Sequence, residues 1–145
     1  YASQDGIVEE VSTEEARGLG VGIVTYDKFE IEYEGVWQSY HIKHRYWHFA
    51  GIHVKLGDEV RIGDLLGWAD STGYSTGTHL HFETKAVKKE QGIWKNVFQD
   101  NGYFCCFDPL PYIIETYAID IKGRLNKIKE LLAQIAEKIS ELLRK

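Results

Sequence analysis

Alternating hydrophobic and polar residues dominate the first 112 positions, and this period-two pattern predicts β-strands. Gly-Asp pairs interrupt the alternation between residues 52 and 67, which predicts short strands joined by tight turns. Longer strands are expected at 6–11, 29–34, 37–49 and 79–84, with an aromatic segment at 94–98. No long helix is expected before residue 113, so the body is predicted to be mainly β.

After residue 112 the spacing of apolar residues changes. Apolar residues recur at steps of three and four, which is the pattern of an amphipathic helix with a heptad seam. The seam is formed by Ala118, Ile121, Leu125, Ile128, Leu132, Ile135, Ile139 and Leu142. The helix either packs on its own domain or joins a second copy or a partner helix through residues 124–145. The chain is therefore divided into a body, 1–112, and a helical tail, 113–145.

Two histidines alternate on the strand predicted at 79–84. His79 and His81 are expected to point the same way, with Leu80 turned into the core. Imidazoles about 7 Å apart along one strand face can serve one metal centre. A loop rich in Gly, Ser and Thr precedes them at 71–78, and small residues let a backbone approach a ligand closely. A third histidine, His48, lies on the strand predicted at 37–49.

The charge is unevenly distributed along the 145 residues. Residues 1–121 hold 10 Lys and Arg against 19 Asp and Glu, a net −9, whereas residues 122–145 hold 7 against 3, a net +4. An acidic body argues against nucleic acid as the main partner. No apolar run approaches the roughly 18 residues that a membrane span needs.

The cysteines and the missing methionine add little to the assignment. Cys105 and Cys106 are adjacent, and neighbouring Cα atoms are about 3.8 Å apart, which is shorter than the usual span of a disulfide. They are expected to be two small buried side chains, and they leave the redox compartment open. The sequence contains no methionine, so Tyr1 is not expected to be a translation start.

Several separated motifs together resemble one family. The segments are TGYSTGTHLHFE at 72–83, YWHF at 46–49, VKLGDEVRIGDLLG at 54–67, the start YA with GIV at 6–8, and DPLPY at 108–112. With this spacing, residues 1–112 resemble the lysostaphin-type zinc endopeptidases. The resemblance implies a compact antiparallel β-sheet or sandwich of the lysostaphin-peptidase type, followed here by the amphipathic helix.

The resemblance also implies the chemistry. His81 is expected to bind zinc, while His48 and His79 help to activate water and to stabilise the developing oxyanion. The implied substrate is the peptide of bacterial peptidoglycan, so the protein is expected to act outside the cell, in the cell envelope or on a virion. Trp47 and Tyr74 are expected to line the substrate groove, together with Ser75 and Thr76.

Two metal ligands expected from the resemblance are missing. The family takes them from a His-x-x-x-Asp element that precedes the position of Tyr1, and a catalytic zinc normally needs three protein ligands. Among local substitutes, His44 is favoured because period two places it on one face with His48. The other candidates considered are Asp5, His41 and Asp70, and His53 is expected to be a surface or structural residue.

Two other functions compete with the peptidase. The first is a catalytically inactive peptidoglycan-binding or structural module, as in a phage tail or an envelope assembly, that oligomerises through its helix. The second is a lipoyl or biotin carrier, which VKLGDEVRIGDLLG alone also resembles. Its turns at Gly57-Asp58 and Gly63-Asp64 offer no acceptor lysine. The remaining tryptophans are expected in the core: Trp37, Trp68 and Trp94.

Overall fold

The computed structural model describes residues 1–100 and 102–143, which divide into two compact units. The first unit, Tyr1–Pro109, contains all the strands, and the second begins at Leu110 and contains the helix. The helix therefore begins at Leu110 rather than after residue 112. Pro111 is its second residue, where the missing N–H of proline costs no intrahelical hydrogen bond.

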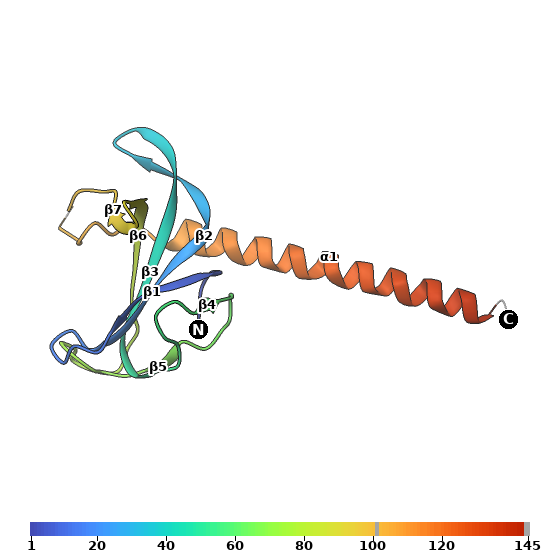
Figure 1. Cartoon of the computed structure of the whole chain (residues 1–145), viewed down its shortest axis with the longest axis horizontal. Helices are drawn as coiled ribbons and strands as arrows, with labels where there is room; N and C mark the ends of the chain where they lie inside the picture. Colours follow the sequence, from blue (N-terminus) through green and yellow to red (C-terminus); the bar gives the residue numbers. More distant parts are fainter. Residues whose placement is uncertain (101, 144–145) are drawn as a thin grey trace. The chain divides into compact units, whose positions relative to one another are not determined.

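One antiparallel sheet forms the first unit, which confirms the expected mainly β body (Figure 1). The strand order is β4-β1-β2-β3-β6-β7, and β5 pairs with β3. The strands are β1 (Gly6–Ser12), β2 (Leu19–Tyr33), β3 (Val36–Ile52), β4 (Glu59–Val60), β5 (Gly67–Ala69), β6 (His81–Glu90) and β7 (Ile93–Asn96). The strand expected at 79–84 thus begins at His81, while His79 forms only an isolated bridge with Asp70.

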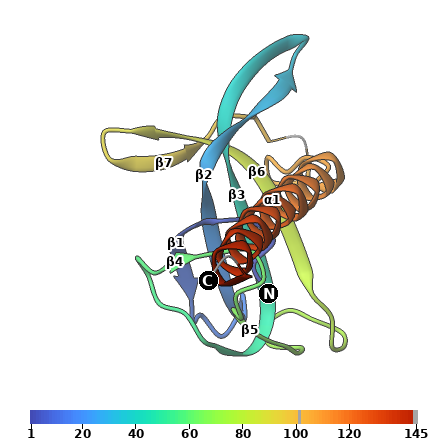
Figure 2. The same ribbon diagram turned by 90° about the vertical axis from the view of Figure 1, so that its right-hand side faces the viewer.

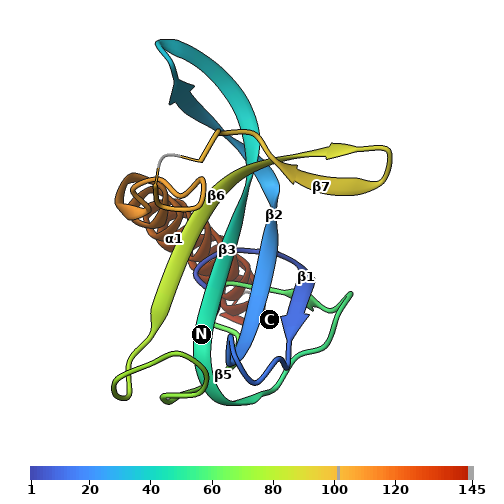
Figure 3. The same ribbon diagram turned by 90° about the vertical axis from the view of Figure 1, so that its left-hand side faces the viewer.

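The long central strands lie side by side and continue beyond the rest of the sheet. Figure 3 shows β1, β2, β3 and β6 next to one another in the body. In Figure 2 the β2–β3 hairpin and the β6–β7 hairpin extend from the body in different directions. The main hydrophobic cluster contains buried side chains from β1, β2, β3 and β4.

The core occupies one face of this sheet. Buried apolar side chains from β1, β2 and β3 meet Val60 and Leu66, which belong to the segment between β3 and β5. This segment covers one face of the sheet. Two tryptophans expected in the core are instead mostly exposed, at 62% for Trp37 and 57% for Trp68. Trp37 is the second residue of β3, next to the turn that follows β2, and it is not part of the core cluster.

The second unit is the helix α1 (Leu110–Leu143), 34 residues long. Within the described residues, no helix combines the length and apolar character that crossing a membrane requires. Its described seam residues are each about half exposed: Leu125, Ile128, Leu132, Ile135 and Ile139. The side chains of Ala118, Ile121 and Leu142, and residues 144–145, lie outside the described residues.

Candidate active site

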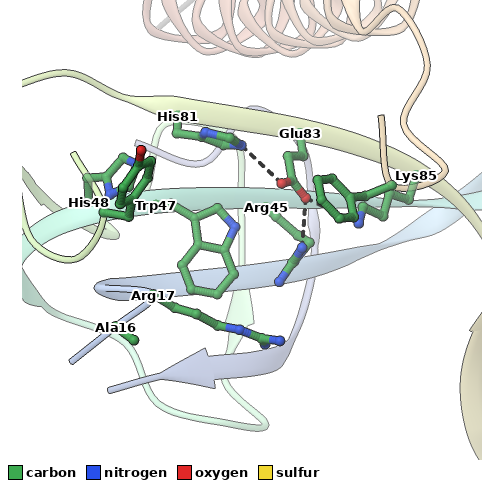
Figure 4. Close-up of a pocket in the computed structure, with 10 residues that line it drawn as sticks. Ala16, Arg17, Arg45, Trp47, His48, His81, Glu83 and Lys85 are labelled. Atoms are coloured by element: carbon green, nitrogen blue, oxygen red, sulfur yellow. Dashed lines mark hydrogen bonds and ion pairs between the residues drawn. The ribbon is translucent and has the colours of Figure 1, made fainter. Parts of the chain in front are cut away.

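Strands β3 and β6 place chemically active residues opposite one another. Their register pairs Trp47 with His81, Arg45 with Glu83, and Lys43 with Lys85. Because alternate residues of a strand share a face, these pairs follow one another along one face of the sheet. A pocket of about 550 Å³ opens there (Figure 4), and its wall includes Arg45, Trp47, His48, His81, Glu83 and Lys85.

A β-bulge brings His48 onto the same face as Trp47. Leu19 of β2 pairs with Phe49 and Gly20 pairs with Trp47, so His48 is the extra residue between two consecutive pairs. Its φ of 68° is uncommon for a residue with a side chain and marks the bend. A Cβ atom on Gly20 would lie 2.2 Å from the Trp47 ring, so the indole needs a glycine beneath it.

His44 lies on the opposite, core face of the sheet, which corrects the expected face shared with His48. Its ring is fully buried and stacks on Phe82 at a centroid distance of 5.3 Å. Tyr46 also packs on Phe82, at 5.0 Å. Period two therefore holds from His44 to Tyr46, and the bulge breaks it before His48. The structure does not bring His44 to the other histidines.

Burial leaves His44 in an unusual state for a histidine. Neither ring nitrogen has a hydrogen-bond partner among the described residues. Burial lowers the pKa of His44 to about 3, because a charged imidazolium is costly away from water. The ring is therefore neutral at physiological pH and acts as a core residue.

The three histidines expected in the site lie close together. The ring of His48 is 4.8 Å from that of His79 and 5.7 Å from that of His81, measured between centroids. His48 comes from β3, whereas the other two come from the loop before β6 and from the first residue of β6. The tertiary structure therefore assembles them from segments about thirty residues apart in the chain.

Backbone carbonyls fix the tautomers of two of these rings. His48 Nδ1 lies 2.7 Å from the carbonyl oxygen of Thr72, and His79 Nδ1 lies 2.7 Å from that of Gly77. A carbonyl oxygen only accepts hydrogen bonds, so each Nδ1 carries the proton and donates it. The Nε2 atom of each neutral ring then has a bare lone pair, which is the form needed by a general base.

His81 has a different partner. Its Nε2 lies 3.0 Å from a carboxylate oxygen of Glu83, so Nε2 donates and Nδ1 keeps the lone pair. A carboxylate that holds one nitrogen of a histidine is the usual arrangement behind a metal-binding imidazole, because it orients the ring and makes the other nitrogen more basic. The corresponding hydrogen-bond partners of His48 and His79 are uncharged backbone carbonyls.

An ion network that the sequence analysis did not identify supports Glu83. Arg45 contacts Glu83 at 2.7 Å and Glu10 at 2.8 Å. Lys85 contacts Glu83 at 3.3 Å, and Lys43 contacts Glu10 at 2.6 Å. Burial opposes ionisation of both carboxyls, but the cations outweigh it and lower the pKa of Glu10 and of Glu83. Glu83 ends the motif at 72–83, but nothing in the sequence indicates these ion pairs, because the residues meet only through strand pairing.

The loop at 71–78 closes one side of the site. Thr72 bonds the Phe49 carbonyl through Oγ1 at 2.8 Å, and a Cβ atom on Gly73 would lie 2.3 Å from the backbone of Arg17. The loop is therefore held tightly against the rest of the body. Tyr74 lines the pocket and is 95% exposed. Leu80, expected in the core, is 50% exposed because regular strand geometry begins only at His81.

Ser75 and Thr76 occupy different positions in this loop. Ser75 Oγ lies 3.4 Å from His79 Nδ1 and donates to the Gly77 carbonyl at 2.9 Å, so it packs beside a histidine without lining the pocket. Thr76 is exposed and does not line the pocket either. Of the four residues expected in the groove, Trp47 and Tyr74 line it.

The described side chains do not form a complete zinc site. Among the side chains that the structure describes, no three His, Cys, Asp or Glu residues are grouped so that they could hold a metal ion. His81 offers one donor, its Nδ1. Two other candidates are engaged elsewhere, since Asp5 accepts from the Ile62 amide at 2.7 Å and His41 Nδ1 bonds the Thr25 carbonyl at 2.8 Å. A metal at His81 would need donors from beyond these residues.

A pocket with paired histidines on an antiparallel sheet is the kind of site that hydrolases use. Residues 1–93 match the sequence profile of peptidase family M23, and the chain belongs to this family. The match contains all three clustered histidines and ends before the segment that leads to α1.

Known proteins are similar in sequence to parts of this chain. It is 36% identical over 115 residues to the glycyl-glycine endopeptidase ALE-1 of Staphylococcus capitis, a match that covers 77% of this chain and 25% of ALE-1. It is 52% identical over 42 residues to lysostaphin of Staphylococcus staphylolyticus, covering 28% of this chain and 9% of lysostaphin. The chain thus spans a quarter or less of the length of these relatives.

A solved structure has the same fold. The catalytic domain of lysostaphin from Staphylococcus simulans superposes with a TM-score of 0.52 at 28% identity, over 76% of this chain and 65% of that domain. The antiparallel fold of the lysostaphin-peptidase type is therefore confirmed.

Proposed function

We propose that this chain belongs to a zinc-dependent endopeptidase that hydrolyses peptide bonds in bacterial peptidoglycan. The observation that carries the proposal is the cluster of His48, His79 and His81, in which the rings of His79 and His81 lie 4.8 and 5.7 Å from that of His48 and in which His48 and His81 line the pocket. Membership of family M23 supports a peptidase. Its substrate places the enzyme outside the cytoplasm, in the cell envelope or on a virion.

The hydrogen-bond partners of the three histidines indicate a different role for His81 than for His48 and His79. His48 and His79 each present a bare Nε2, so either ring can accept the one proton that the attacking water loses and return it to the leaving amine. His81, oriented by Glu83, is the residue to bind zinc. Zinc would supply the Lewis acidity that these side chains lack. Trp47 and Tyr74 form groove walls on which the peptide lies.

The second candidate function is a non-catalytic module that binds peptidoglycan or builds an assembly. Two observations favour it: the described residues hold no complete zinc site, and the helix carries a half-exposed apolar seam. In this case the β unit is a scaffold and α1 drives oligomerisation through residues 124–145, as in a phage tail or an envelope complex.

Zinc content separates these two functions. For the endopeptidase, we expect about one tightly held zinc per molecule of the native protein that contains these residues, measured by plasma mass spectrometry after dialysis. The same sample should release new amino groups from purified peptidoglycan, and a chelator should stop the release. A native protein that holds no zinc and releases no amino groups would contradict the endopeptidase and support the module.

Polar substitution of the seam tests oligomerisation. Replacing Leu132 and Ile135 by glutamine removes two seam residues, which are 60% and 53% exposed. If α1 joins a second copy, the mass measured by light scattering should fall to that of one chain, 16.7 kDa. Glu130→Gln is the matched control on the same helix and should not change the mass. An equal mass for parent and double variant would exclude oligomerisation through the seam.

A further inference from the structure

The ion network beneath the pocket has more cations than anions. Glu10 contacts Lys43 and Arg45, and Glu83 contacts Arg45 and Lys85, so the five side chains form one continuous series. Among the described residues, no other aspartate or glutamate forms an ion pair with these three cations. Three positive charges therefore face two negative charges, and one positive charge is unbalanced.

Of the three cations, Lys85 has the weakest contact with an anion. Its ammonium lies 3.3 Å from Glu83, the longest ion-pair contact in the network, and its side chain is only 8% exposed. A buried ammonium is costly unless an anion and hydrogen bonds surround it. Lys85 lines the pocket, whereas Lys43 does not, so an anion entering the pocket would meet Lys85.

Lys85 lies at the far end of the pocket from the histidines. His81, Glu83 and Lys85 occupy alternate positions on β6, which separates the first from the last by about 13 Å. Figure 4 shows His48 and Lys85 at opposite ends, with Arg45 and Glu83 between them. An extended peptide covers this distance with about four residues.

An exposed aromatic residue lines the pocket at the same end. The Phe107 amide donates to the Thr84 carbonyl at 3.1 Å, and Cys106 forms a β-bridge with Lys85, which holds the loop before them against β6. Phe104 of this loop lines the pocket and is 71% exposed, with a φ of 54°. It lies beyond residues 1–93, which match the family profile, so this wall of the pocket comes from a part of the chain outside the match.

We propose that Lys85 and Phe104 form a subsite for a carboxylate-bearing residue of the peptide substrate. The inference rests on the proposed function and specifies its substrate class, an acidic peptide. The Lys85 ammonium donates to the carboxylate and thereby balances the network, while the Phe104 ring packs on the aliphatic part of the same residue. A stretch of glycine alone offers neither group, so the site favours a peptide with an acidic side chain about four residues from the bond that is cleaved.

Peptide binding tests the subsite without any need for turnover. The probes are end-capped glycine octapeptides in which each position in turn is glutamate or glutamine, titrated into the full chain by calorimetry. For at least one position, glutamate should bind about tenfold more tightly than glutamine, the effect expected of one charge-assisted hydrogen bond. The preference should disappear in Lys85→Met and should only weaken in the matched control Lys43→Met, which lowers the charge of the same network outside the pocket but leaves the Lys85 ammonium in place.

Several outcomes overturn the inference. They are equal binding of glutamate and glutamine peptides at every position, a preference that Lys85→Met leaves intact, and no binding of any peptide at millimolar concentration. The comparison of the two peptides uses the parent chain, so it holds even if Lys85→Met does not fold. Hydrolysis without a glutamate preference would contradict this inference alone, and a glutamate preference without hydrolysis would contradict the proposed function alone.

Discussion

Replacing His48 or His79 by alanine is expected to lower the rate of peptide hydrolysis by about 10²–10⁴-fold, which is the usual contribution of a general acid or base. Each ring presents a bare Nε2 because its Nδ1 donates to a backbone carbonyl at 2.7 Å. Neither variant should lose bound zinc, since the expected ligand is His81. His81→Ala should lose both zinc and hydrolysis.

The measurement is the initial rate of amino-group release from purified peptidoglycan, together with zinc content, for each variant. His53→Ala is the matched control, because His53 is exposed, lies near Trp68 and does not line the pocket. It should keep the parent rate. Equal rates in the parent and all three site variants would show that the histidine cluster does not carry the reaction.

His44→Leu is expected to stabilise the fold and to change its response to acid. Leucine has a similar volume and no polar atom, so the variant removes a buried ring whose two nitrogens lack hydrogen-bond partners among the described residues. A buried group of this kind costs about 1–3 kcal/mol. We therefore expect the free energy of unfolding at pH 7.5 to rise by about this amount, measured by urea denaturation.

The acid response follows from the pKa of His44. Its folded-state pKa of about 3 lies below the value near 6.5 of an unfolded histidine, so the unfolded chain binds more protons as pH falls. The stability of the parent is thus fully present above pH 6.5 and declines between pH 6.5 and about 3. By pH 5 the loss from this residue is about 2 kcal/mol.

His44→Leu should not show this part of the decline, so its advantage over the parent should grow on acidification from pH 7.5 to pH 5. The exposed His53 provides the control, because His53→Leu should follow the parent curve. If His44→Leu and the parent lose stability equally over this pH range, His44 does not titrate as a buried group.

The sequence predicted the β body, and it singled out three histidines that the structure brings together, but it did not indicate all the residues that surround them. The alternation is a local property of each strand, and it marked β3 and the end of β2 at 29–34 but not the first part of β2, residues 19–28. The exposed Trp37 shows where such reasoning fails, because hydrophobicity alone does not say whether a strand extends beyond the core. Arg45 and Glu83 illustrate the same limit, since strand register joins them and no sequence pattern indicates their ion pair.

By itself the sequence determined that the body is β-rich, that a long amphipathic helix follows it, and that His48, His79 and His81 stand in motifs of the lysostaphin type. Only the tertiary structure decided which histidines face the pocket. The reason is the bulge at His48, which depends on how β3 pairs with β2 and not on the local alternation of either strand. That one extra residue turns His48 towards the pocket and leaves His44 in the core.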